Sequence, residues 1–79
     1  MYTIKELLQH SAETLKNAGI ETPVIEAGVM LCHVLKCNRA YLISHNDRAL
    51  AEHELEEFKK LLKGRTEKIP LQYLLGETE

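Results

Sequence analysis

The sequence of 79 residues predicts an all-α fold, a small bundle of four to five short helices. Apolar residues recur at the three- and four-residue spacing that places side chains on one face of a helix, and no stretch alternates apolar and polar residues as a half-buried strand does. Helix start and stop signals divide the chain into segments of helical length joined by short turns. The composition, 44% apolar and 28% charged, is that of one small globular domain.

The first helix is expected to begin at the Thr3 cap and to be ended by Asn17 and Gly19. Thr3 and Glu6 stand three residues apart, the spacing of a capping box in which each side chain accepts a hydrogen bond from the other residue's backbone amide. Asn17 and Gly19 then provide a helix stop, because glycine readily adopts the left-handed backbone that ends many helices. The apolar residues of this helix fall on one face: Ile4, Leu7, Leu8, Ala12, Leu15 and Ala18.

The second helix is expected from Pro23 to about Lys36. Proline at the first helical position loses no hydrogen bond, and the hydroxyl of Thr22 is expected to cap the free amides. Apolar residues surround most of the girth of this helix, which predicts a central, buried position. Gly28 lies in its middle, where glycine costs about 1 kcal/mol relative to alanine, and a close helix crossing is expected to offset that cost.

Two more helices follow the second one. Asn38 is a capping residue for a short helix over residues 39–44, and a turn is expected at 45–48. A fourth helix is expected at residues 51–63, with Gly64 near its end. Its core face carries leucines and the only phenylalanine of the chain.

The last helix is expected to be short. Pro70 stands at its first helical position, residues 71–75 form it, and Gly76 ends it. Taken alone, residues 68–75 resemble a strand, but the proline start and the glycine stop favour a helix.

The charge balance of the sequence argues against several classes of function. The net charge is −2 with both signs interspersed, which disfavours direct binding to nucleic acid. No apolar run is long enough to span a membrane and the start is unlike a signal peptide, so a cytoplasmic protein is expected. The glycines are scattered singly and form no phosphate-binding loop. We therefore assign no catalytic residue and no bound cofactor to these 79 residues.

The two cysteines, Cys32 and Cys37, are expected to be free thiols that pack as small apolar side chains. His33 and Cys37 would be an i,i+4 pair if the second helix extended that far, but no recognisable spacing supplies further metal ligands. A metal site is therefore not expected.

A cluster of basic residues surrounds the end of the fourth helix. One interpretation is that these cations complement the helix dipole and face solvent. The other is a docking surface for an acidic patch on a partner or on the remainder of the protein. The cluster comprises Lys59, Lys60, Lys63, Arg65 and Lys68.

Two segments resemble the HemK/PrmC family, the protein-(glutamine-N5) methyltransferases that act on peptide chain release factors. Residues 64–79, Gly-Arg-Thr-Glu-Lys-Ile-Pro-Leu-Gln-Tyr-Leu-Leu-Gly-Glu-Thr-Glu, are similar to the family's hinge run Glu-Pro-(Leu/Ile)-x-Tyr-(Leu/Ile)-x-Gly that follows a basic pair. Residues 25–35 are similar to its Asp-Ala-Glu-Leu-Leu-Leu-x-His-Val-Leu pattern. Ile69 replaces the glutamate before proline, Thr66 the second arginine, and Gly28 a glutamate.

The resemblance implies a division of labour between two domains. Residues 1–76 would be a helical substrate-recognition domain, and residues 77–79 the start of the linker to a Rossmann-like methyltransferase domain. The latter would hold S-adenosylmethionine and an Asn-Pro-Pro-Tyr motif beyond residue 79, and the helical domain would help to hold the release factor so that its Gly-Gly-Gln glutamine reaches that site. The isolated domain would be monomeric.

Four residues of the hinge run are candidates for the hinge and for packing on the catalytic domain. For Tyr73, ordinary core packing with an exposed hydroxyl group is the alternative. The four residues are Pro70, Tyr73, Leu74 and Gly76.

Two other functions remain open from the sequence. A stand-alone helical protein–protein interaction module, dimeric through an apolar strip on the last helix, is one. A small helical nucleic-acid-binding domain is the other; the lysine cluster suggests it and the acidic balance opposes it.

Overall fold

The computed structural model describes residues 2–76, and over this range the chain is all-α, as predicted. An isolated antiparallel bridge joins Thr3 to Ala49, and the described residues contain no sheet. None of the described helices is both long enough and apolar enough to cross a membrane. The helices are α1 (Ile4–Asn17), α2 (Pro23–Leu35), α3 (Arg39–Ser44), α4 (Glu52–Thr66) and α5 (Leu71–Leu75).

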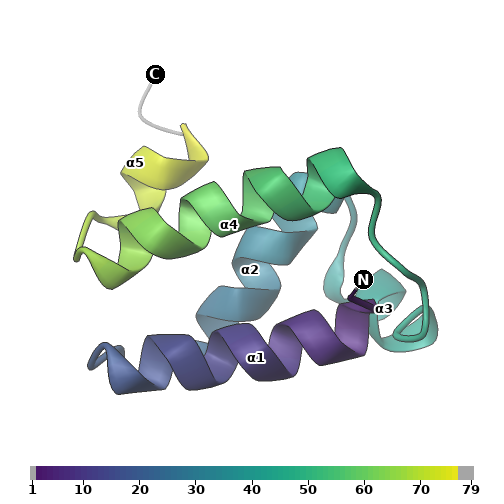
Figure 1. Ribbon diagram of the computed structural model, residues 1–79, viewed down its shortest axis with the longest axis horizontal. Coiled ribbons are helices and arrows are strands. Elements are labelled where there is room, and N and C mark those ends of the chain that lie inside the picture. The colour runs from purple at the N-terminus through teal and green to yellow at the C-terminus, as the bar shows by residue number, and fades with distance from the viewer. Residues whose placement is uncertain (1, 77–79) are drawn as a thin grey trace.

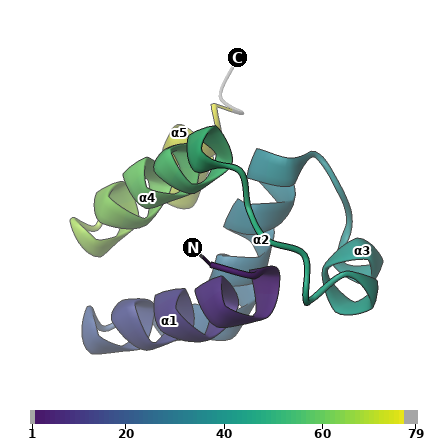
Figure 2. The same ribbon diagram turned by 45° about the vertical axis from the view of Figure 1, so that its right-hand side comes forward.

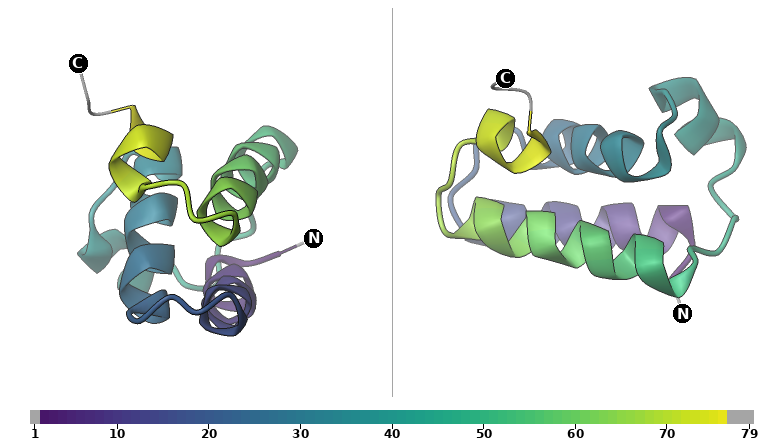
Figure 3. Two further views of the ribbon diagram at one scale, coloured as in Figure 1. Left: turned by 90° about the vertical axis from the view of Figure 1, so that its left-hand side faces the viewer. Right: turned by 90° about the horizontal axis from the view of Figure 1, so that it is seen from above.

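Three helices build the body of the domain. α1 and α4 run in the same direction, and α2 packs across both of them (Figure 1). α3 lies beside the start of α1 (Figure 2), whereas α5 packs on α4 near the other end of the molecule (Figure 3). The two short helices therefore flank the bundle at opposite ends.

The core lies where α1, α2 and α4 meet. Phe58 of α4 is fully buried among aliphatic side chains from all three helices. The buried face of α1 includes a polar residue, because Ser11 is fully buried whereas the neighbouring Ala12 is only half-buried. The hydroxyl of Ser11 donates to the carbonyl oxygen of Leu7 at 2.7 Å, which satisfies the buried polar group. The other fully buried large side chains are Ile4, Leu7, Leu15, Met30 and Leu31.

The start of α1 is closed by its own cap and by a distant loop. The capping box is confirmed, with Glu6 donating from its amide to Thr3 Oγ1 at 3.2 Å and Thr3 donating from its amide to Glu6 Oε1 at 3.1 Å. The amides of Ile4 and Lys5 donate to carbonyl oxygens of residues 48 and 46, each at 2.9 Å. The loop before α4 therefore satisfies amides that a helix start leaves free.

The start of α2 differs from the expectation in one respect. Pro23 is its first residue, as predicted, but the hydroxyl of Thr22 makes no capping hydrogen bond, so that prediction is wrong. The backbone of Thr22, at φ −123° and ψ 64°, is not the extended conformation from which a capping side chain usually reaches the second or third helical amide. At the other end, Lys36 takes a left-handed conformation and ends the helix where it was expected to end.

The remaining helices follow the predicted order with shifted ends. Asn38 caps α3 as expected, its Oδ1 accepting from the amide of Tyr41 at 2.9 Å. α4 continues to Thr66, beyond the predicted end at residue 63, so that Gly64 lies inside the helix. Pro70 is the residue before α5 and not its first helical residue.

Candidate docking surfaces

The α4–α5 hairpin is built on a close approach between Gly64 and Leu74. Gly64 is buried in α4, and a Cβ atom at this position would lie 2.5 Å from Cδ2 of Leu74. Carbon atoms in favourable contact are about 3.5–4.0 Å apart, so a side chain at Gly64 would require Leu74 to move. The absence of a side chain at Gly64 lets α5 lie directly on α4.

Gly28 does not make the close helix crossing that was expected of it. It is buried, but a Cβ atom there would come no nearer than 3.9 Å to its first neighbour, Nη2 of Arg39. The close helix contact is made instead by Gly64, which the sequence pattern placed near the end of α4. Both glycines interrupt a helical pattern, and the pattern alone does not tell which one meets a neighbouring helix.

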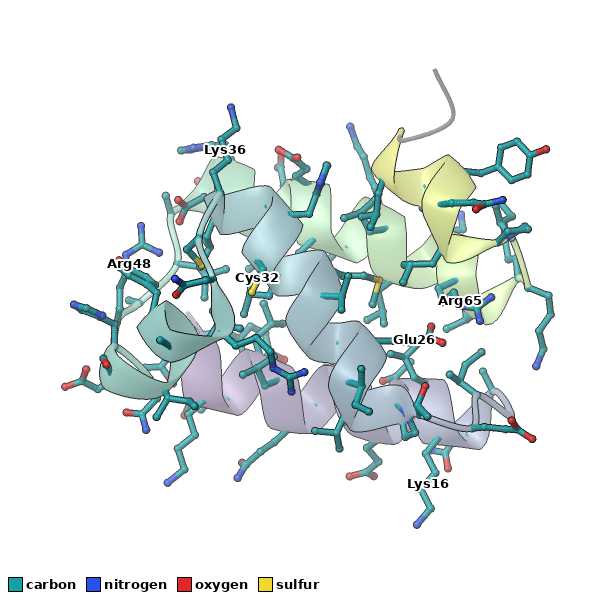
Figure 4. The ribbon with its side chains drawn as sticks, turned by 180° about the vertical axis from the view of Figure 1, so that it is seen from behind. Lys16, Glu26, Cys32, Lys36, Arg48 and Arg65 are labelled. Atoms are coloured by element: carbon teal, nitrogen blue, oxygen red, sulfur yellow. The ribbon has the colours of Figure 1, made fainter. Side chains whose placement is uncertain are left out.

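Arg65 forms a two-point ion pair with Glu26 of α2. Its Nε donates to Oε1 at 2.6 Å and its Nη2 to Oε2 at 3.2 Å, while Nη1 donates to the carbonyl oxygen of Ile69 at 3.2 Å. The hydrogen bond to Glu26 raises the pKa of Arg65, and burial only partly opposes it. The two side chains face each other in Figure 4. Arg65 thereby joins α4, the connection to α5, and α2.

Glu26 was not among the predicted site residues. The only signal for it was its place at the acidic position that opens the family's second-helix pattern. Its partner is 39 residues away in the sequence, so no helical spacing could connect the two.

Lys68 connects the end of α4 to the end of α1. Its backbone is left-handed, with φ at 71°, and the amides of Lys68 and Ile69 donate to the carbonyl oxygens of Arg65 and Gly64 at 2.9 and 3.1 Å. This pair of hydrogen bonds is the Schellman pattern, in which glycine usually occupies the left-handed position. The Nζ of Lys68 donates to the carbonyl oxygen of Ala18, the C-cap of α1, where a cation also complements the helix dipole.

The predicted basic cluster therefore divides into two groups. Arg65 and Lys68 have partners within the domain. Lys59, Lys60 and Lys63 are exposed on α4. These three lysines are the part of the cluster that is available to a partner.

The candidate hinge residues also take different environments. Leu74 is half-buried against Gly64, whereas Pro70 and Gly76 are exposed, and Gly76 ends α5 in a left-handed conformation as predicted. Tyr73 is 63% exposed, so its interpretation as a core residue is wrong. α5 therefore directs a large aromatic side chain outward. The predicted linker at residues 77–79 lies outside the described residues.

Glu54 links the start of α4 to the loop that closes α1. Its Oε1 accepts from the amide of Ala51 at 2.9 Å, and its Oε2 accepts from Nη2 of Arg48 at 3.2 Å. Burial raises the pKa of Glu54, but the Ala51 amide and the Arg48 guanidinium outweigh it, so that the pKa is lowered overall. Because alanine has no side-chain acceptor, Glu54 makes the only side-chain contribution to this helix cap.

The thiols and histidines do not combine into a metal centre within residues 2–76, where no three potential ligands gather. Because α2 ends at Leu35, His33 and Cys37 are not an i,i+4 pair on one helix. Cys32 and Cys37 are free, half-buried thiols, and burial together with the neighbouring Cys32 raises the pKa of Cys37.

The fold and these surfaces define a small helical domain whose ion pairs and close contacts hold its helices together and whose exposed lysines and Tyr73 lie outside. The family described as the PrmC N-terminal domain matches residues 6–76. The chain belongs to this family, so the HemK/PrmC resemblance of its two segments is confirmed.

Longer relatives align with nearly all of the chain. The release factor glutamine methyltransferase of Vibrio cholerae is 38% identical over 98% of this chain, and that of Aliivibrio fischeri is 35% identical over 98%. The bifunctional methyltransferase of Rickettsia typhi is 36% identical over 99%. The chain spans 27% of the length of the first two relatives and 15% of the third. No solved structure matches it.

Proposed function

We propose that this chain is the non-catalytic substrate-recognition domain of a release factor glutamine methyltransferase. Residues 1–76 hold the release factor, and a separate catalytic domain binds S-adenosylmethionine and methylates the glutamine of the factor's Gly-Gly-Gln motif. The observation that carries this proposal is the match of residues 6–76 to the PrmC N-terminal domain family. The reaction is proposed from the names of longer relatives, of which this chain spans 27%.

The cofactor is assigned to the other domain for a physical reason. Cofactors of this kind are commonly held by a glycine-rich turn that follows a strand. Residues 2–76 contain no strand beyond one isolated bridge, and the four glycines of the chain stand singly. The donor groups of this domain thus do not form such a cradle.

A recognition domain suits methyl transfer to one side-chain amide on a large protein. The reacting nitrogen has to be held in line with the methyl group, and contacts remote from the reaction can supply the binding free energy for that orientation. We expect this domain to raise kcat/KM for the intact release factor and to leave kcat/KM for a short peptide substrate largely unchanged.

The outer face of α5 is the proposed contact with the catalytic domain. A helix of five residues is too short to be stable alone, and here it packs on the domain through Leu71, Leu74 and Leu75. Tyr73 points away from that contact and is 63% exposed. Packing of the catalytic domain on Tyr73 and Pro70, with Gly76 as the turn, would bury the free side of α5.

The exposed lysines of α4 are proposed as a second contact. Lys59, Lys60 and Lys63 place three positive charges on one exposed stretch of helix. They suit an acidic patch, either on the catalytic domain or on the release factor.

The test compares two substrates of the full-length methyltransferase that contains this chain. Deletion of residues 1–76 is expected to lower kcat/KM for an intact release factor by at least about tenfold, and to leave kcat/KM for a short Gly-Gly-Gln peptide within about twofold. Because a deletion can disturb folding, the isolated 79-residue chain is also added in excess to the intact enzyme, where it should inhibit methylation of the factor but not of the peptide. Equal losses with both substrates and no inhibition would contradict a recognition role. Sedimentation of the isolated chain with the release factor gives a further outcome. If the chain self-associates and does not bind the factor, a stand-alone interaction module is favoured.

A further inference from the structure

A continuous shallow groove runs along α1 on the side that faces α2 and α3. It consists of three adjoining hollows of about 430, 300 and 110 Å³, and neighbouring hollows share lining residues. The hollows extend along α1 from Lys5 to Asn17, a rise of about 18 Å at 1.5 Å per residue. The smallest hollow joins the other two, and its lining is Leu8, Val24, Gly28, Arg39, Leu42 and Ile43. We call this feature the α1–α3 groove.

Large apolar side chains stand exposed on the walls of this groove. Val24 is 65% exposed and Ile43 is 75% exposed, and each lines the hollow that joins the other two. Single exposed hydrophobic residues are common, but here they flank a concave surface whose lining also includes Leu8 and Leu42. Exposed apolar side chains that flank a concave surface are suited to contact with apolar side chains of a partner.

Gly28 has a role in the shape of the groove. It lies in the floor, where a Cβ atom would be 3.9 Å from Nη2 of Arg39. The guanidinium of Arg39 therefore lies over the glycine of α2 and not over a bulkier side chain. This arrangement places a positive charge beside the apolar walls.

The charges that line the groove are mostly positive. Lys5, Lys16 and Arg39 line it together with a single carboxylate, Glu13, although the chain as a whole carries a net charge of −2. Lys16 projects from α1 into solvent in Figure 4. An occupant with apolar side chains along one face and carboxylates at its margins would match both the walls and the charges of the groove.

The groove lies apart from the surface proposed for the catalytic domain. Its walls come from α1, α2 and α3, whereas Tyr73 is on α5, and α4 lies between α5 and α1 (Figure 1). One domain can therefore contact both the catalytic domain and a third protein. The groove is available to the protein substrate while α5 is covered.

We propose that the α1–α3 groove binds an amphipathic helix of the release factor, with the apolar face of that helix against Ile43, Val24 and Leu8 and its flanking carboxylates beside Arg39, Lys5 and Lys16. This inference rests on the proposed function. The length of the groove accommodates about three helical turns, and an amphipathic helix in an apolar groove is a common mode of recognition between proteins. The lysines of α4 are then left to the catalytic domain.

The decisive experiment measures binding of a purified bacterial release factor to the 79-residue chain and to two matched variants. Ile43→Glu places a charge on the groove wall, and Ile25→Glu places the same charge on an aliphatic residue of α2 that is 49% exposed and does not line the groove. Ile43→Glu should weaken binding at least about tenfold and Ile25→Glu less than about twofold. Circular dichroism verifies that each variant is folded.

A second pair of variants keeps the test independent of the folding of Ile43→Glu. Arg39→Glu should weaken binding and Lys36→Glu, an exposed lysine that does not line the groove, should not. Amide shifts of the labelled chain should change mainly along α1, at the start of α2 and in α3. If the factor binds but the shifts fall on α4 and the groove variants bind normally, the groove is excluded and the proposed function stands. If the factor does not bind at all, the proposed function fails, and the groove inference fails with it.

Discussion

Leu74 of α5 occupies the space that a side chain at Gly64 of α4 would need, with its Cδ2 2.5 Å from where the Cβ would be. α5 can therefore lie at this position because residue 64 of α4 has no Cβ atom. The neighbouring residue Arg65 is bound to Glu26 of α2, so one short stretch of α4 holds both α5 and α2.

The first prediction compares alanine at the two glycines inside helices. Gly28→Ala should raise the free energy of unfolding by about 0.5–1 kcal/mol, because the new Cβ finds ordinary space at 3.9 Å and alanine is the better helix former. Gly64→Ala should lower it by about 1–3 kcal/mol, because Leu74 must be displaced. Urea unfolding followed by circular dichroism measures both. If the two variants were equally stabilised, Leu74 would be free to move and the close approach would impose no constraint.

The second prediction concerns the coupling between Arg65 and Glu26. Both side chains are mostly shielded from solvent, 19% and 16% exposed, and the contact has two hydrogen bonds. A double-mutant cycle with Arg65→Gln and Glu26→Gln should give a coupling free energy of about 1–2 kcal/mol.

The matched control for this cycle is the pair of Arg48 and Glu54. It has a single hydrogen bond and its arginine is 35% exposed, so its coupling should stay below about 1 kcal/mol. A larger coupling for Arg48 and Glu54 than for Arg65 and Glu26 would show that the two-point geometry does not matter.

The third prediction separates the two roles of Lys68. Lys68→Met removes the hydrogen bond to Ala18 and keeps a side chain on a left-handed backbone, so it should destabilise the domain by about 1 kcal/mol. Lys68→Gly removes the same hydrogen bond but relieves the left-handed strain of about 1 kcal/mol or more, so it should be close to neutral. Thermal unfolding of both variants tests this ranking. Equal melting temperatures would mean that the left-handed conformation carries no cost here.

The fourth prediction is an acid dependence that arises from Glu54. Its pKa is lowered in the folded state, so its ionised form contributes stability at pH values above the ordinary value of 4.5, and this contribution is lost as the pH falls through the lowered value. Glu54→Gln keeps an acceptor for the Ala51 amide and removes the charge. The native chain should be more stable than this variant at pH 7, by less than about 1 kcal/mol because the partner Arg48 is partly exposed, and the difference should shrink below pH 4.5. A difference that stays constant from pH 7 to pH 3 would exclude the charge as its source.

Local signals explain which parts of the fold were predictable. The capping box of Thr3 with Glu6 and the cap at Asn38 involve residues three positions apart, and both are present as expected. The predicted end of α4 was wrong because the helix is stopped by Lys68 in a left-handed conformation. Glycine in a sequence indicates such a stop, and lysine does not. The local pattern also predicted a cap at Thr22, but the hydroxyl of this residue makes no capping hydrogen bond.

The candidate site was predicted less completely than the fold. The basic cluster was recognised from its composition, but its division into internal cations and exposed lysines depends on where α1 and α2 come to lie. The α1–α3 groove was not foreseen, because its walls belong to three helices that no repeat or spacing links.

The sequence by itself determined the all-α class, the order of the five helices and membership of the PrmC N-terminal domain family, because periodicity, caps and motifs are properties of neighbouring residues. Only the tertiary structure decided that Gly64 and not Gly28 receives a neighbouring helix, and that Arg65 meets Glu26 across 39 residues. The physical reason is that helix spacing sets which side chains share a face, but the packing of whole faces sets how each helix is rotated and where it crosses the next.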